Sequence, residues 1–161
     1  MNGVEHTAPP GTLLLATDGS EHATDALIAG LRIAAMPTAA LLVTVVPGAD
    51  PGAVVGSGHA GPVMTPAQLT ELIDTREHEA ADVLGAAATV IAEQIDGLDL
   101  HTQVLAGDPG EEICRAAAER GMAGIVMGTH GLGGIKRALL GSVSDYVVRH
   151  APCPVITVGT S

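Results

Sequence analysis

Short apolar runs alternate with segments of helical periodicity along most of this chain. The runs predict buried strands at residues 12–17, 40–46, 98–106, 123–127 and 155–158. Between them, apolar side chains recur at helical spacing, for example at Leu27, Ile28 and Leu31. Apolar strands separated by helices are typical of a parallel sheet covered on both faces. Because crossover connections are right-handed, the pattern predicts a single doubly wound α/β fold.

Polar residues before the predicted helices indicate where each helix begins. Ser20 can cap a helix after the first strand. Thr65 and Gln68 form a capping-box pattern around a proline, and that helix is predicted to run to about residue 94. Asp108 precedes a further helix in the same way, and the last predicted helix spans residues 143–150.

The domain organisation follows from length and from one compositional break. With 161 residues, the chain has the length of one domain with a sizeable core. We expect a flexible tail over residues 1–10 and the folded domain over 11–159. Residues 47–66 are rich in glycine and proline and contain no lysine or arginine. They predict a mobile surface loop, with an ordered lid as the alternative.

The segment 128–144 carries five glycines and joins a predicted strand to the last helix. Without Cβ atoms, its backbone amides can approach an anion closely. Gly141 and Ser142 lead into the first helical turn, where free N–H groups and the helix dipole attract phosphate. We expect unusual backbone torsions at Gly141 for that reason. The segment predicts a phosphorylated ligand, with a nucleotide as the first hypothesis and an unliganded tight turn as the alternative.

Composition and charge narrow the classes of partner. The net charge is −11, with seven basic residues, no Phe or Trp, and one tyrosine, Tyr146. Polymeric nucleic acid requires clustered basic side chains, and single strands also require stacking aromatic rings. We therefore exclude polymeric nucleic acid as a partner. Because the overall charge repels phosphate, a nucleotide site must rely on local backbone geometry, with Lys136 and Arg137 either helping or lying in a solvated turn.

The sequence carries few features that bear on cellular targeting or on the redox state of its cysteines. No apolar run approaches the ~20 residues of a membrane span. The first ten residues lack the charged and apolar parts of a signal peptide, so we expect a cytoplasmic protein with no membrane partner. Cys114 and Cys153 are distant in sequence and are expected to be reduced, buried thiols.

Gly128-x-x-Gly131, followed by nine residues and Gly141-Ser142, carries a family resemblance. Thr17-Asp18-Gly19-Ser20 follows the first strand, and Ala151-Pro152-Cys153-Pro154 precedes the last. With these motifs the chain resembles the ATP-binding subgroup of the universal stress protein family over residues 11–159, with 47–66 unmatched. The resemblance implies a five-stranded parallel sheet of order 3-2-1-4-5.

The resemblance also implies the residues that contact ATP. Ala16, Thr17 and Asp18 would lie along the adenosine half, and Val45 and Met127 would contact the adenine. The ribose and phosphates would be held by Gly128, Gly131, Gly141, Ser142, Val143 and Ser144. His130 would either donate to a phosphate or lie in solvent, and Asp18 would otherwise only cap the following helix. Mg²⁺ is a candidate companion of ATP, with no ligands assigned.

The resemblance further implies a homodimer that acts as a stress-response sensor or regulator. Val155 to Val158 would form an edge strand without a charge or an internal proline to prevent pairing with a second copy. The alternative is an edge covered by the C-terminal tail. No catalytic residue is assigned, because the serines have no histidine singled out by spacing and Asp18 is a single carboxylate.

Three other functions compete with ATP binding. A cyclic-AMP-binding protein of the same fold would need fewer phosphate donors. A nucleotide hydrolase would be slow at most. A dimerisation scaffold would bind no nucleotide.

Overall fold

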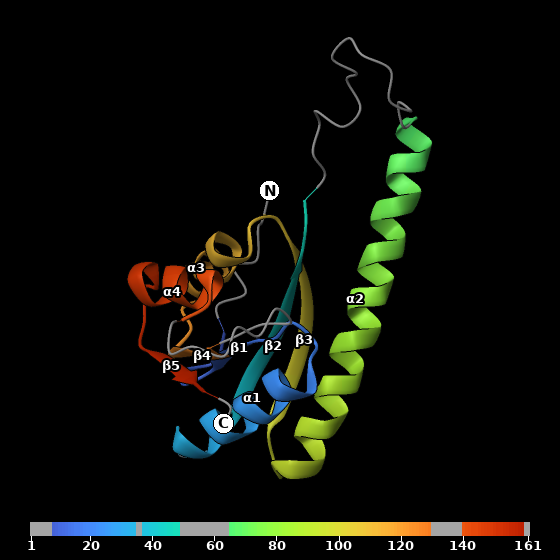
Figure 1. The fold of residues 1–161 in the computed structure, drawn as a ribbon. Helices are drawn as coiled ribbons and strands as arrows, with labels where there is room; N and C mark the ends of the chain where they lie inside the picture. The colour runs from blue at the N-terminus through green and yellow to red at the C-terminus, as the bar shows by residue number, and fades with distance from the viewer. Residues whose placement is uncertain (1–7, 35–36, 49–64, 130–139, 160–161) are drawn as a thin grey trace, which may run out of the picture.

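The computed structural model describes residues 8–34, 37–48, 65–129 and 140–159, which form one sheet flanked by helices (Figure 1). The elements in chain order are β1 (Leu13–Ala16), α1 (Glu21–Ile33), β2 (Ala39–Val46), α2 (Pro66–Gln94), β3 (Asp99–Ala106), α3 (Pro109–Arg120), β4 (Gly124–Gly128), α4 (Ser142–His150) and β5 (Val155–Val158). Most of the predicted tail 1–10 and loop 47–66 lies outside the described residues. Ala8, the first described residue, donates its N–H to the Arg120 carbonyl at 3.0 Å.

The five strands are parallel and lie in the order β3-β2-β1-β4-β5. This order confirms both the doubly wound α/β fold and the topology that the resemblance implied. β1 is central, since Leu15 lies opposite Leu42 of β2 and Val126 of β4. The order of strands reverses between β1 and β4, which is where ligands bind in open α/β sheets.

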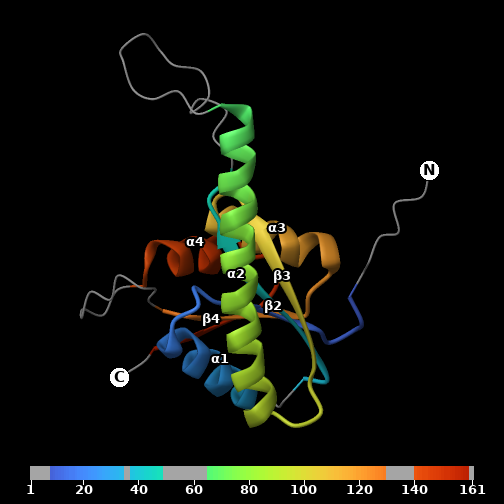
Figure 2. The ribbon, with the colours of Figure 1, turned by 90° about the vertical axis from the view of Figure 1, so that its right-hand side faces the viewer.

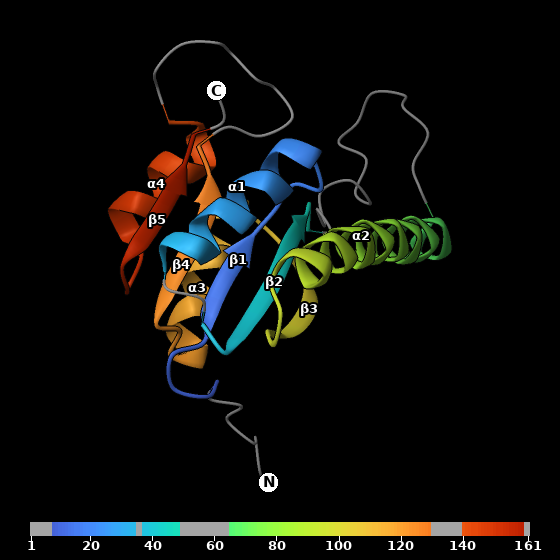
Figure 3. The same cartoon turned by 90° about the horizontal axis from the view of Figure 1, so that it is seen from below.

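The two faces of the sheet pack against different helices. Successive side chains of β1 point to opposite faces, so Leu15 joins one apolar cluster and Leu14 the other. The first cluster includes α1 and α2, and the second includes α3 and α4 (Figure 3). Both clusters are made of aliphatic side chains that are almost fully buried, as the predicted layers require.

Side chains cap three helices where the sequence predicts. Ser20 accepts from the N–H of Ala23, Asp108 accepts from that of Glu111, and Thr65 forms the complete capping box with Gln68. Each cap satisfies N–H groups that the first helical turn leaves unpaired. The predicted starts of α1, α2 and α3 are therefore confirmed.

Helix α2 is long for a domain of this size. Its 29 residues correspond to about 43 Å at 1.5 Å per residue. Leu84, Ala87 and Ile91 are buried against the sheet, whereas the described residues of α2 before Val83 are exposed or half-buried. The first turns of α2 extend beyond the end of β2 (Figures 1 and 2). The buried core residues of α2 therefore lie in its C-terminal part, from Leu84 onward.

Strand β5 lies at one edge of the sheet, as predicted. Its residues Val155–Val158 are all half-buried. Among the helices that the structure describes, none is long and apolar enough to cross a membrane.

Candidate functional site

The carboxyl ends of β1 and β4 bring two predicted site segments together. Ala16, the last residue of β1, pairs with Met127 of β4. The turn that follows β1 and the glycine-rich segment that follows β4 therefore start side by side. Because the strand order reverses between these two strands, this is the expected place for a ligand.

The turn after β1 is fixed by its own hydrogen bonds. The Thr17 N–H donates to the Val43 carbonyl at 3.0 Å, and the Gly19 N–H donates to the Thr17 hydroxyl at 3.0 Å. Asp18 Oδ1 accepts from both the N–H and the hydroxyl of Ser20, at 3.0 and 2.8 Å. These bonds orient the Asp18 carboxylate before any ligand arrives.

The second carboxylate oxygen of Asp18 is the unusual atom of this turn. Asp18 Oδ2 is buried and has no hydrogen-bond partner among the described residues. A buried carboxylate oxygen without a donor costs free energy, because it loses its water without replacement. A ligand that offers an N–H or O–H group would remove that cost. Asp18 is not the cap of α1, since Ser20 accepts the hydrogen bond from the N–H of Ala23.

Hydrogen bonds connect the residues at the two ends of the glycine-rich segment. The Gly141 N–H donates to the Thr129 carbonyl at 2.8 Å, and the Ser144 hydroxyl lies 3.0 Å from the same oxygen. The Ser144 hydroxyl also lies 3.0 Å from the Gly141 carbonyl, and its side chain is almost fully buried. The Gly141 N–H and the Ser144 hydroxyl belong to residues that are predicted to contact ribose or phosphate. In the structure both groups donate to the Thr129 carbonyl.

Helix α4 begins beside these hydrogen bonds without a side-chain cap. Gly141 is its N-cap residue and makes no side-chain hydrogen bond, in contrast to Ser20, Thr65 and Asp108. The N–H groups of the first turn have no partner within the helix. With the Gly141 N–H bonded to the Thr129 carbonyl, the N–H groups of Ser142, Val143 and Ser144 are the first-turn donors that the helix can offer to an anion.

One expectation about Gly141 is wrong. Its φ of −61° and ψ of 160° are ordinary extended values that any residue adopts. A glycine is therefore not required here by torsion. The chain turns into α4 without strain, and among the described residues of the site Gly19 is the glycine in the left-handed conformation, with φ of +83°.

Aliphatic residues line one face of the sheet near this edge. Ala16 and Met127 are almost fully buried, and half-buried Val45 packs against the same cluster. Thr17 is also buried, and Gly128 is half-buried at the end of β4. The predicted adenine contacts thus share a face. His130, Gly131, Lys136 and Arg137 lie outside the described residues.

Sequence reasoning missed a close contact between α3 and α4. A Cβ atom built on Gly110 would lie 2.6 Å from Cδ1 of Tyr146. The Tyr146 ring also stacks on His150 with centroids 4.2 Å apart. Partial burial raises the pKa of Tyr146, and the negative charge of Glu111 raises it further. Tyr146 is the only Phe, Tyr or Trp residue of the sequence. Its rarity was the one sequence signal that could have drawn attention to this position.

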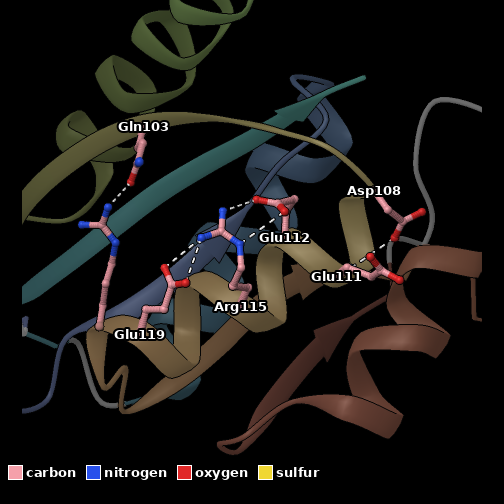
Figure 4. A network of polar contacts seen from close by, with 7 residues as sticks. Gln103, Asp108, Glu111, Glu112, Arg115 and Glu119 are labelled. Carbon is pink, nitrogen blue, oxygen red and sulfur yellow. Dashed lines mark hydrogen bonds and ion pairs between the residues drawn. The ribbon is translucent and has the colours of Figure 1, made fainter. Parts of the chain in front are cut away.

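Charged side chains on the outer face of α3 form ion pairs with one another. Arg115 binds Glu112 on one side and Glu119 on the other, and Asp108 caps the helix (Figure 4). Arg120 donates to Gln103 of β3 at 2.6 Å. Within the described ranges, no three His, Cys, Asp or Glu side chains gather as ligands for a metal ion.

The two cysteines are free but less buried than predicted. Cys114 of α3 and Cys153 before β5 are half-buried and pack against the same apolar cluster. Burial raises the pKa of Cys114, and the nearby Cys153 raises it further. Burial alone raises the pKa of Cys153. Both thiols are therefore mostly protonated at neutral pH.

Comparison with known proteins gives consistent matches over nearly the whole chain. The profile described as the universal stress protein family matches residues 11–159. The chain is 33% identical over 147 residues to universal stress protein YxiE of Bacillus subtilis, covering 91% of this chain and 97% of that protein.

Solved structures are similar as well. Universal stress protein UspA from Lactobacillus plantarum is 27% identical, with a TM-score of 0.71 over 94% of this chain and 99% of that one. A universal stress protein in complex with cAMP is 25% identical, with a TM-score of 0.53 over 93% of this chain and 97% of that one.

Proposed function

Because the chain belongs to the universal stress protein family, we propose that it binds an adenine nucleotide, with ATP as the first candidate, between β1 and the start of α4. The observation that carries this proposal is the buried, unpartnered Oδ2 of Asp18 at the strand-order reversal. A nucleotide offers what this oxygen lacks, since adenine has an amino group and ribose has hydroxyl groups. The similar universal stress protein in complex with cAMP supports the same class of ligand.

The parts of the nucleotide would contact chemically different parts of the site. The aliphatic side chains of Ala16, Val45 and Met127, which share one sheet face, would pack against the base. The phosphates would accept hydrogen bonds from the first-turn N–H groups of α4 at Ser142 and Val143. This assignment gives Gly141 and Ser144 the role of holding those N–H groups in place through Thr129.

We propose a sensor or regulator rather than a high-turnover enzyme. Fast phosphoryl transfer needs a positioned metal ion and an oriented nucleophile. The carboxylate that we assign to the site is Asp18, and one of its oxygens is already held by Ser20. Mg²⁺ would then reach the site chiefly through the phosphate oxygens of ATP.

The test of nucleotide binding compares two matched charge removals. Calorimetric titration with ATP, AMP and cyclic AMP should give binding to the wild type, with ATP the tightest. Asp18→Asn keeps the oxygen that Ser20 binds but removes the charge at Oδ2, so its affinity for ATP should fall by about tenfold. Asp99→Asn removes the same charge at the exposed, opposite end of the sheet and should leave affinity unchanged.

Each other outcome selects a different function. Tighter binding of cyclic AMP than of ATP would favour the cyclic-nucleotide alternative. Equal affinities of the wild type and Asp18→Asn would place the ligand elsewhere. If none of the three nucleotides binds, the dimerisation scaffold becomes the better account.

We also propose a homodimer through β5. The N–H of Ile125 donates to Pro154 and that of Thr129 to Val158. By the alternation of a parallel ladder, the N–H of Thr157 faces away from β4 and is available to a second copy. Thr157→Pro should remove that donor and give a monomer in light scattering.

The opposite edge of the sheet offers a matched control. The N–H groups of Asp99 and Gly107 donate to the chain of β2, so the N–H of Thr102 points outward from β3. Thr102→Pro should leave a β5 dimer intact. A wild-type monomer, or a dimer that survives Thr157→Pro, would refute this interface.

A further inference from the structure

We propose that Val83 of α2 is a positioning residue for the nucleotide site, because it holds the turn that carries Asp18. The inference rests on the proposed function but adds a residue of α2 to it. Gly19, the residue after Asp18, and Val83 are 64 residues apart in the sequence, and no sequence motif connects them.

Gly19 and Val83 are in close contact. A Cβ atom built on Gly19 would lie 2.2 Å from Cγ1 of Val83, 3.5 Å from its Cβ and 3.8 Å from its Cγ2. The γ-methyl groups of Val83 therefore occupy the space beside the Gly19 backbone. With φ of +83°, Gly19 also adopts the left-handed conformation that favours glycine. Torsion and space both require glycine at this point of the turn.

The contact occurs at the middle of the turn, between its two fixed ends. Thr17 is bonded to β2 through the Val43 carbonyl, and Ser20 is fixed as the cap of α1. The contact with Val83 fixes Gly19, the residue directly after Asp18. A shift of Gly19 would move the Ser20 N–H that Asp18 Oδ1 accepts and would thereby rotate the unpartnered oxygen.

Val83 is well suited to this role. It is 39% exposed and directly precedes Leu84, whose side chain is 1% exposed in the core. The core therefore fixes the backbone at Val83. A β-branched side chain is also stiff at χ1, so its methyl groups keep one position. The orientation of Asp18 is thus tied to the placement of α2.

The test is a set of substitutions at Val83 with a matched control on the same helix. Val83→Ala removes the methyl groups and should weaken ATP binding by about fivefold, because the site becomes less preorganised. Val83→Thr keeps the branched shape and should retain wild-type affinity. Val90→Ala, at a position that is 41% exposed, should also leave affinity unchanged.

A double-mutant cycle separates positioning from a general loss of stability. In the Asp18→Asn background, Val83→Ala should weaken ATP binding by less than about twofold, since its effect acts through Asp18. An undiminished fivefold loss in that background would overturn the inference, as would a Val83→Ala protein that binds ATP like the wild type. A wild type that binds no nucleotide would instead overturn the proposed function and this inference together.

A second measurement needs no ligand. The N–H groups of Gly19 and Ser20 are both bonded inside the turn. Val83→Ala should accelerate hydrogen exchange at these two amides relative to Val90→Ala. Equal exchange rates in the two variants would contradict the positioning role.

Discussion

The contact between Gly110 and Tyr146 predicts that alanine at position 110 destabilises the protein. Gly110 is buried in the first turn of α3, and Tyr146 lies on α4, four residues after the start of that helix. Gly110→Ala adds a single methyl group at this point. Alanine normally stabilises a helix relative to glycine, so we attribute the expected destabilisation to the neighbouring Tyr146 side chain.

The magnitude follows from the distances. The added Cβ would lie 2.6 Å from Cδ1, 2.8 Å from Cγ and 3.1 Å from Cβ of Tyr146. Carbon atoms in contact are normally about 3.5–4.0 Å apart, so the ring must retreat by about 1 Å. Such overpacking costs about 1–3 kcal/mol, and the helix propensity of alanine returns up to ~1 kcal/mol. We expect a net loss of about 1–2 kcal/mol, or roughly 3–6 °C in Tm for a domain of this size.

The assay is thermal unfolding followed by circular dichroism and by tyrosine fluorescence. Because the chain has one tyrosine and no tryptophan, its emission reports on the Tyr146 ring alone. Gly110→Ala should change that emission below the unfolding transition. Gly85→Ala is the matched control, since no atom of the described residues outside the adjacent backbone of α2 lies within 4 Å of a Cβ at this exposed position, and it should raise Tm.

Two results would contradict a clash between residues 110 and 146. The first is a Gly110→Ala protein at least as stable as the wild type. The second is an equal cost of Gly110→Ala in a Tyr146→Ala background, where the two closest contacts are removed with the ring and only the 3.1 Å contact with Cβ remains, so most of the cost should be lost.

Two further predictions concern the core and the thiols. Gly30→Ala should lower the unfolding free energy by about 2 kcal/mol in urea denaturation, because its Cβ would lie 2.2 Å from Cγ1 of fully buried Val126; wild-type stability would contradict this packing. Cys114 and Cys153 should react slowly with a thiol reagent at pH 8 and faster as the pH passes 9, because burial raises both pKa values above the ordinary 9.0. Since the protonated thiols are favoured in the folded state, their contribution to stability is complete below about pH 9 and is lost as the pH rises through the raised pKa values. Reaction at the rate of the urea-unfolded chain would contradict this.

Much of the fold could be predicted because its signals are local. Ser20, Thr65 and Asp108 begin helices by capping N–H groups within three residues of themselves. The strands were recognisable from their apolar runs, and their ends differ from the structure by one residue where they differ, as at Leu13. The strand order came from the resemblance rather than from the pattern.

The unpredicted features are contacts between residues distant in sequence. Gly19 meets Val83, and Gly110 meets Tyr146, through the packing of helices that the sequence does not place. The torsion of Gly141 differs from the prediction because a glycine at an N-cap needs no special torsions, and Gly141 forms an ordinary N-cap. The predicted contacts of the other site residues with a nucleotide remain predictions.

Titration of the ¹⁵N-labelled protein with ATP, followed by amide chemical shifts, tests nucleotide binding between β1 and α4. The largest shifts are expected in two groups at once, at Asp18 to Ser20 after β1 and at Ser142 and Val143 at the start of α4. Saturation with ATP that moves amides elsewhere and leaves these two groups unchanged would contradict binding at this place.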